Sequence, residues 1–206
     1  MKIDAPAGIR IVALSGSVRP GNYTGKALAL VMEELAAHQD VVARLLDPAA
    51  LDLPLPGRDP DNPLLLREFR DTVASATGVI LATPEYHGSF SSVMKLAIDN
   101  LGFPSALGGK PVALLGVAAG QIGAVKAAEH LRSVCSHIGA LVLPGTVSVA
   151  NVQQLFDEQG RCLDPRIERR IRGVATNLLD YIHGHICPKV TLEHMAREAE
   201  AAGTRR

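Results

Sequence analysis

The stretch IRIVALSGSVRPGNYT, residues 9–24, decides the fold. It begins with an apolar run from Ile9 to Leu14 that contains almost no polar alternation. Such a run is typical of a strand in a parallel sheet, because helices cover both faces of that sheet. A loop rich in glycine and hydroxyl groups follows, and from Tyr23 to His38 apolar residues recur at helical spacing. The stretch therefore predicts a strand, a loop and a helix in direct succession.

The same alternation of short apolar runs and helical patterns continues along the chain. Further strands are predicted at residues 41–46, 78–83, 111–117 and 140–143. Helices are predicted at residues 64–76, 90–101, 124–138 and 164–183. The last of these has Asp164 as its N-cap and Pro165 in its first position. Five strands that alternate with helices predict a doubly wound α/β domain.

Composition limits the classes of protein to which this chain can belong. Lysine and arginine together number 21, as do aspartate and glutamate, and this zero net charge removes the general attraction to nucleic acid. Aromatic residues make up 3% of the chain and tryptophan is absent, so a base-stacking platform is not expected. No apolar run approaches the ~18 residues of a membrane-spanning helix. We therefore expect neither nucleic acid nor a membrane as a partner.

The length of 206 residues suits one domain, predicted at residues 1–185, and the charged segment 186–206 is expected to be a partly ordered tail. The start of the chain lacks the pattern of a secretory signal. Widely spaced cysteines favour reduced thiols and a cytoplasmic location. These are Cys135, Cys162 and Cys187. The histidines near the end of the last helix are irregularly spaced, so no metal site is predicted.

Ligands of a doubly wound domain bind outside the carboxyl ends of the strands. Three loops are expected at that edge, at residues 15–22, 84–89 and 118–123. The first loop does not match the nucleotide motifs that it superficially resembles. A phosphate-binding P-loop requires lysine where Asn22 follows Gly21, and the spacing Gly-x-Gly-x-x-Gly does not occur.

The first loop nevertheless has the features of an anion site. A helix that begins near Tyr23 presents unpaired backbone N–H groups and the positive end of its dipole. Ser17 and Thr24 add hydroxyl donors, Asn22 adds an amide, and Arg19 adds a guanidinium that suits phosphate oxygens. From this loop alone, an alternative stays open in which Asn22 or Thr24 only caps the helix and Arg19 is a solvated charge.

Two motifs taken together resemble a known family. Ser15-Gly16-Ser17-x-Arg19 follows the first strand, and Pro84-Glu85-Tyr86-His87-Gly88-Ser89 follows the third. This pair, at this spacing, resembles the NAD(P)H-dependent FMN reductase family, which includes flavin, quinone, azo-dye and chromate reductases. The resemblance covers residues 9–143. It implies a flavodoxin-like α/β fold, in which a five-stranded parallel sheet has the order 2-1-3-4-5 and helices on both faces.

The resemblance also implies which residues hold the cofactor FMN. The phosphate would be held by Ser17, Arg19, Asn22, Tyr23 and Thr24. The isoalloxazine ring would be lined by Pro84, Glu85, Tyr86, His87 and Gly88, with backbone contacts from Ala118 and Gly120 of the third loop. Family members more often have serine at the position of Asn22 and asparagine at that of His87. No catalytic side chain is predicted, because the flavin itself carries the chemistry.

The activity implied by the resemblance is that of an FMN-containing oxidoreductase. Hydride would pass from NADPH or NADH to the flavin, and two electrons would then pass to flavin, quinone or a similar small-molecule acceptor. The resemblance further implies a homodimer or homotetramer, with the helices at 64–76 and 90–101 as candidates for the subunit contact. Two alternatives stay open: a flavodoxin-type electron carrier without its own substrate, and a phosphate-ligand binder without flavin. Neutral charge and scarce aromatic residues count against the carrier.

Overall fold

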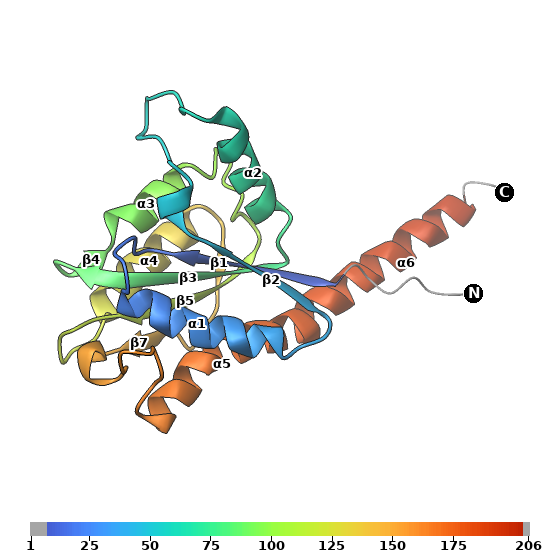
Figure 1. Ribbon diagram of the computed structural model, residues 1–206. Helices are drawn as coiled ribbons and strands as arrows, with labels where there is room; N and C mark the ends of the chain where they lie inside the picture. Colours follow the sequence, from blue (N-terminus) through green and yellow to red (C-terminus); the bar gives the residue numbers. More distant parts are fainter. Residues whose placement is uncertain (1–7, 204–206) are drawn as a thin grey trace.

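Five parallel strands form the centre of the computed structural model, which describes residues 8–203 (Figure 1). They lie in the order β2-β1-β3-β5-β6, which confirms the order 2-1-3-4-5 expected for the five predicted strands. Their bounds are Ile9–Ser15 (β1), Val41–Leu46 (β2), Gly78–Tyr86 (β3), Pro111–Val117 (β5) and Leu141–Val142 (β6). Two short strands, β4 at Ser89–Phe90 and β7 at Val147–Val149, pair with β3 and β5, so the sheet has seven strands rather than five.

Five of the helices in the described residues lie close to their predicted positions, and the sixth lies in the segment expected to be a partly ordered tail. Their bounds are Tyr23–Ala36 (α1), Pro63–Ala74 (α2), Ser92–Asp99 (α3), Val125–His137 (α4), Pro165–Tyr181 (α5) and Cys187–Gly203 (α6). Four of them begin after a short polar side chain that accepts a hydrogen bond from a backbone N–H of the first turn, which satisfies a donor that has no intrahelical partner. These capping residues are Asn22, Asn62, Ser91 and Asp164.

Successive residues of the central strands contribute to two hydrophobic cores on opposite faces of the sheet. In β1, Ile11 and Ala13 belong to the core that includes α1 and α5, whereas Val12 and Leu14 belong to the core that includes α2, α3 and α4. Figure 1 shows these two groups of helices on either side of the sheet. Every residue of β5 is buried. The apolar strands of the sequence are therefore explained by helices on both faces.

The edge of the sheet beside β5 differs from the prediction of one strand at 140–143. Here β6 pairs with the start of β5, through Pro111 and Val112, and β7 pairs with the end of β5. The chain between them turns at Gly145, whose φ of 81° lies in the left-handed region that favours glycine. This interruption divides one edge strand into two, and β7 continues toward the carboxyl end of the sheet.

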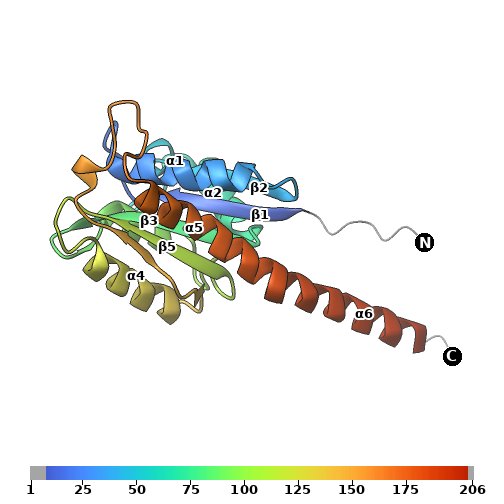
Figure 2. The same ribbon diagram turned by 90° about the horizontal axis from the view of Figure 1, so that it is seen from below.

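The C-terminal segment forms a helix that leaves the sheet. After α5 the chain passes through a π-helical turn at Ile182–Ile186 and continues as α6, which Figure 2 shows extending away from the sheet. Residues 204–206 of the expected tail lie outside the described residues, and the division at residue 185 remains a prediction. Of the helices in residues 8–203, none combines the length and hydropathy that crossing a membrane requires.

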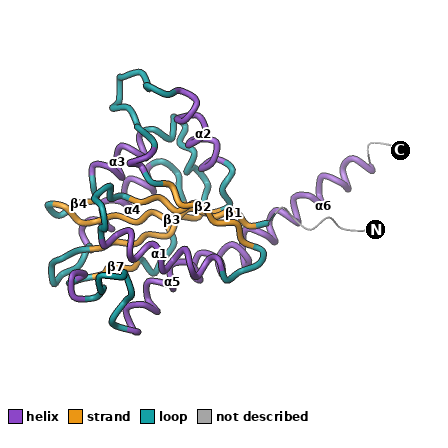
Figure 3. Tube along the Cα trace, in the orientation of Figure 1, coloured by secondary structure: helices purple, strands orange, loops and turns teal. Residues whose placement is uncertain are grey.

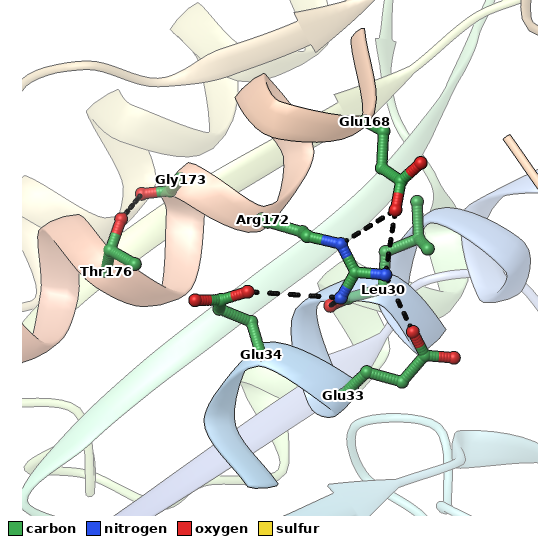
Figure 4. Close-up of polar contacts among 7 residues, drawn as sticks. All are labelled: Leu30, Glu33, Glu34, Glu168, Arg172, Gly173 and Thr176. Carbon is green, nitrogen blue, oxygen red and sulfur yellow. Dashed lines mark hydrogen bonds and ion pairs between the residues drawn. The ribbon is translucent and has the colours of Figure 1, made fainter. Parts of the chain in front are cut away.

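One arginine joins α1 to α5. Arg172 donates to Glu33 Oε2 at 2.8 Å, to the carbonyl of Leu30 at 3.1 Å and to Glu168 Oε1 at 2.9 Å, and Glu34 lies beside it (Figure 4). The hydrogen bond that Glu33 accepts raises the pKa of this guanidinium above its usual value. The Arg172 side chain is only 27% exposed, so these interactions are partly shielded from water. They hold α1 against α5, and the first turn of α1 forms part of the site described below.

Replacement of Arg172 by alanine is expected to lower the free energy of unfolding by about 1–2 kcal/mol, because the change removes several partly shielded contacts at once. Urea denaturation measures this loss. Arg170→Ala, an exposed arginine on the same helix, is the matched control and should change stability by less than about 0.5 kcal/mol. Equal effects of the two substitutions would show that the contacts of Arg172 contribute nothing to stability.

Candidate functional site

The three predicted loops meet beyond the carboxyl ends of β1, β3 and β5, where they enclose a cavity of about 440 Å³. Figure 3 shows loops gathered at this end of the sheet, next to β4. Nine of the twelve residues predicted for the site line the cavity: Ser17, Arg19, Asn22, Tyr23, Thr24, Pro84, Glu85, Tyr86 and Ala118. The other three, His87, Gly88 and Gly120, do not line it. The fold therefore brings together residues from all three loops.

One wall of the cavity is the first turn of α1. Asn22 is the N-cap: its Oδ1 accepts from the N–H of Gly25 at 2.7 Å, and its Nδ2 donates to the carbonyl of Arg19 at 2.6 Å. The amide of Asn22 thus has the capping role that the sequence left open. The backbone N–H groups of Tyr23 and Thr24 belong to the turn that has no intrahelical acceptors. They make this wall suitable for an anion, because the dipole of α1 has its positive end here.

Two buried hydroxyl groups lie beside this helix terminus. Ser17 is 4% exposed and Thr24 is 2% exposed, and both line the cavity. The backbone of Ser17 is held by Ser15, whose Oγ accepts from the N–H of Ser17 at 3.4 Å and donates to its carbonyl at 3.2 Å. The loop thus presents hydroxyl donors on a backbone that is fixed by hydrogen bonds within the loop.

The second loop is a tight hairpin between β3 and β4. Tyr86 pairs with Ser89 across the two strands, and His87 and Gly88 form the turn with φ values of 50° and 74°. A two-residue turn with positive φ at both positions matches the right-handed twist of the strands. Asparagine, aspartate and histidine tolerate positive φ better than most residues. His87 is therefore explained by the turn, and its exposed side chain does not reach the cavity wall.

Glu85 serves the neighbouring helix. Its Oε2 accepts from the N–H of Ala127 at 3.0 Å, in the first turn of α4, and the N–H of Ala124 donates to Ser148 Oγ at 2.8 Å. The N-cap residue of α4, Ala124, has no polar side chain of its own. The carboxylate of Glu85 therefore replaces the missing cap and complements the positive end of the α4 dipole. The Oε2 atom of Glu85 is thus engaged with α4.

The third loop is bonded to a segment that the sequence did not place in the site. The N–H of Val152 donates to the carbonyl of Ala118 at 3.1 Å, and that of Asn151 donates to the carbonyl of Gly120 at 3.2 Å. These bonds bring Val152 and Gln153 into the cavity wall, while Gly120 itself anchors the loop. A signal was present in the sequence: Val147-Ser148-Val149 alternates as a strand does and is followed by a polar run at 151–154.

The first and second loops also contact each other directly. The Cζ atom of Arg19 lies 5.0 Å from the centroid of the Tyr86 ring, within the range of a cation–π interaction. Both side chains line the cavity, and Tyr86 is 36% exposed. Among the described residues, no group of three or more His, Cys, Asp or Glu side chains is arranged to hold a metal ion. The guanidinium of Arg19 and the N-terminus of α1 make this cavity suitable for an anion.

A larger hollow of about 820 Å³ lies between α3 and α4, away from the three loops. It is bordered by Phe103, which is fully exposed, and by Lys95 and Asp99, which pair with each other at 2.7 Å. No helix N-terminus contributes to it, and its charged groups are already paired. The cavity at the strand ends is therefore the candidate site, although it is the smaller of the two.

Replacement of Glu85 by alanine is expected to lower the free energy of unfolding of the ligand-free protein by about 1 kcal/mol, because α4 loses its cap. Glu85→Gln keeps a hydrogen-bond acceptor and should lose less. Urea denaturation of both variants checks this order, with Glu129→Ala, an exposed residue on α4, as the control. If the glutamine variant is as unstable as the alanine variant, the carboxylate acts through its charge rather than as an acceptor.

Known proteins resemble this chain in sequence and in fold. The family model described as NADPH-dependent FMN reductase matches residues 9–154. An NAD(P)H-dependent FMN reductase of Pseudomonas aeruginosa is 32% identical over 170 residues, which cover 80% of this chain and 90% of that protein. A 2-hydroxy-1,4-benzoquinone reductase of a Burkholderia species is 34% identical over 138 residues, covering 66% of this chain and 74% of that protein.

A solved structure shares the fold. It is a flavoenzyme NAD(P)H:(acceptor) oxidoreductase of Paracoccus denitrificans, which superposes with a TM-score of 0.69 at 23% identity and covers 86% of this chain and 98% of its own. The family inferred from the first two loops is thus confirmed by a match that extends over most of the chain. From these sequence matches, the chain belongs to the NADPH-dependent FMN reductase family.

Proposed function

We propose that this chain binds FMN in the cavity of the three loops and uses NADPH or NADH to reduce a small-molecule acceptor, a flavin or a quinone. The observation that supports the proposal is the cavity itself, which the N-terminus of α1 lines together with an aromatic ring and apolar residues. The relatives support an enzyme over an electron carrier, since they are named as reductases. A quinone reductase of Escherichia coli is 27% identical over 201 residues, covering 95% of this chain and 94% of that protein.

The donor set of the cavity fits a ligand with a phosphate at one end and a flat ring at the other. The phosphate end has the N–H groups of Tyr23 and Thr24, the hydroxyl groups of Ser17 and Thr24, and the guanidinium of Arg19. The rest of the lining includes the Tyr86 ring and apolar residues. These apolar residues are Pro84, Val117, Ala118 and Val152. A charged group and an aromatic ring system would each meet groups that stabilise it.

Bound FMN would supply the redox chemistry, accepting a hydride from the nicotinamide and passing electrons to the acceptor. The residues of this chain would bind the FMN and orient it. Ser17, Arg19 and the first turn of α1 would hold the phosphate. Glu85 holds the start of α4 and, with it, the third loop in place. Reduction of a quinone by NADPH or NADH also takes up one proton, which solvent would supply, so we assign no side chain to proton transfer.

The assay that tests the function is consumption of NADPH or NADH by the purified protein with FMN and a quinone. Steady turnover is expected, and a yellow colour or a flavin absorbance should accompany the protein. Comparison of kcat/KM for the two nucleotides and for several acceptors identifies the preferred substrates. A protein that stays colourless with added FMN contradicts the proposal. Reduction of bound FMN without turnover would indicate a carrier.

Substitution of Arg19 by alanine should weaken the binding of FMN by about 1.5–3 kcal/mol, because a charge-assisted contact to the phosphate is lost. Quenching of flavin fluorescence on binding measures the affinity. Arg170→Ala removes an exposed arginine from α5 and serves as the matched control. Unchanged affinity of the Arg19 variant would place this guanidinium outside the phosphate site.

We further propose that the protein is a cytoplasmic homodimer or homotetramer. Exposed apolar side chains support a subunit contact through the surfaces of α2 and α3: Leu64 is 78% exposed, and Phe103, shortly after α3, is fully exposed. All three cysteines are free thiols, which suits a reducing compartment. Light scattering should give a multiple of the mass of one chain, 21.8 kDa. A monomer at micromolar concentration contradicts this assembly.

A further inference from the structure

The contact between Arg19 and Tyr86 joins two side chains that the proposed function places at opposite ends of FMN. Arg19 is assigned to the phosphate and Tyr86 to the ring. In the structure, however, the guanidinium lies over the Tyr86 ring, 5.0 Å from its centroid. Tyr86 is 36% exposed and lines the cavity, so the guanidinium covers aromatic surface that a flat ligand would use. The guanidinium of Arg19 cannot contact the phosphate of FMN and cover the Tyr86 ring at the same time.

The side chain of Arg19 can change partners without movement of the loop. Its carbonyl accepts from the N–H of Asn22 at 3.3 Å and from Nδ2 of Asn22 at 2.6 Å, so the backbone is fixed to the N-cap of α1. In residues 8–203, none of the ion pairs includes Arg19. The Tyr86 ring is therefore the contact that holds the guanidinium, and rotation of the side chain alone is enough to release it.

The relative strengths of the two contacts favour an exchange when a phosphate is present. A cation–π contact at an exposed site changes an equilibrium constant by about two- to fivefold. A charge-assisted hydrogen bond to a phosphate changes it by about 10- to 100-fold. A phosphorylated ligand therefore supplies enough differential binding to move Arg19 from the ring to the phosphate. A ligand without a phosphate has to displace the guanidinium with no compensating contact.

We propose that Arg19 makes the site selective for phosphorylated over unphosphorylated flavins in two ways: it binds the phosphate of FMN, and it covers Tyr86 against flavins that lack one. The inference rests on the proposed function, because it takes the flavin ring to contact Tyr86. Selectivity built from an attraction and an obstruction together exceeds what either provides alone. Arg19 thereby becomes a residue that determines specificity, beyond its role as a phosphate ligand.

The test is the effect of Arg19→Ala on two ligands, FMN and riboflavin, measured by quenching of their fluorescence. If Arg19 only attracts the phosphate, the Arg19→Ala variant should bind FMN more weakly and riboflavin with unchanged affinity. The proposal predicts opposite signs: FMN binds about 10- to 100-fold more weakly and riboflavin about two- to fivefold more tightly. Riboflavin affinity that is unchanged or reduced in this variant overturns the proposal, and FMN binding by the unaltered protein still supports the proposed function.

A double-mutant cycle shows whether the gain for riboflavin comes from Tyr86. In a Tyr86→Leu background, Arg19→Ala should no longer tighten riboflavin binding, because the leucine offers no aromatic face. In a Tyr86→Phe background the gain should persist. A gain that survives in the leucine background means that Arg19 obstructs the site in another way and overturns the role of the ring. Arg170→Ala, which should alter neither ligand's affinity, is the control for loss of positive charge.

Discussion

Gly16 holds the start of the first loop tightly against β3. Its N–H donates to the carbonyl of Ala82 in β3 at 2.7 Å, and its carbonyl accepts from Ser91 Oγ at 2.6 Å. A Cβ at this position would lie 2.9 Å from the oxygen of Ala82, a backbone atom that cannot move aside. Only glycine therefore lets the first loop leave β1 against the end of β3. The first turn of α1 and the hairpin meet in one cavity because of this contact.

Ser91 connects the same point to the opposite face of the sheet. Its Oγ donates to Gly16 and accepts from the N–H of Met94, so one hydroxyl both fixes the first loop and caps α3. α4 shows a related arrangement, since its first turn is held by Glu85 from β3 and by Ser148 from β7. The helices around the site thus begin at side chains supplied by the loops and strands that line it. Packing of the helices and shape of the cavity are consequently coupled.

Much of the fold followed from local patterns. The apolar run at 9–14 and the helical spacing after Tyr23 predicted β1 and α1. Burial on both faces of a sheet leaves an apolar run, and burial of one helix face leaves a period, so each can be read from the residues of that element alone. The capping roles of Asn22 and Asp164 are local as well, since each side chain bonds to a backbone N–H two or three residues away. The split of the edge strand was missed because β6 has two residues and the alternation at β7 covers only three, too short a stretch to predict a strand by itself.

The sequence by itself determined the sheet, the three loops at its carboxyl edge and, through two paired motifs, the family. Only the tertiary structure decided what each side chain in those loops does. Glu85 bonds to an N–H 42 residues away, and Gln153 reaches the cavity through bonds between the third loop and Asn151. The guanidinium of Arg19 lies on Tyr86, a residue of another loop. These contacts join segments far apart in the chain, and a local pattern carries information only about residues that are neighbours along it.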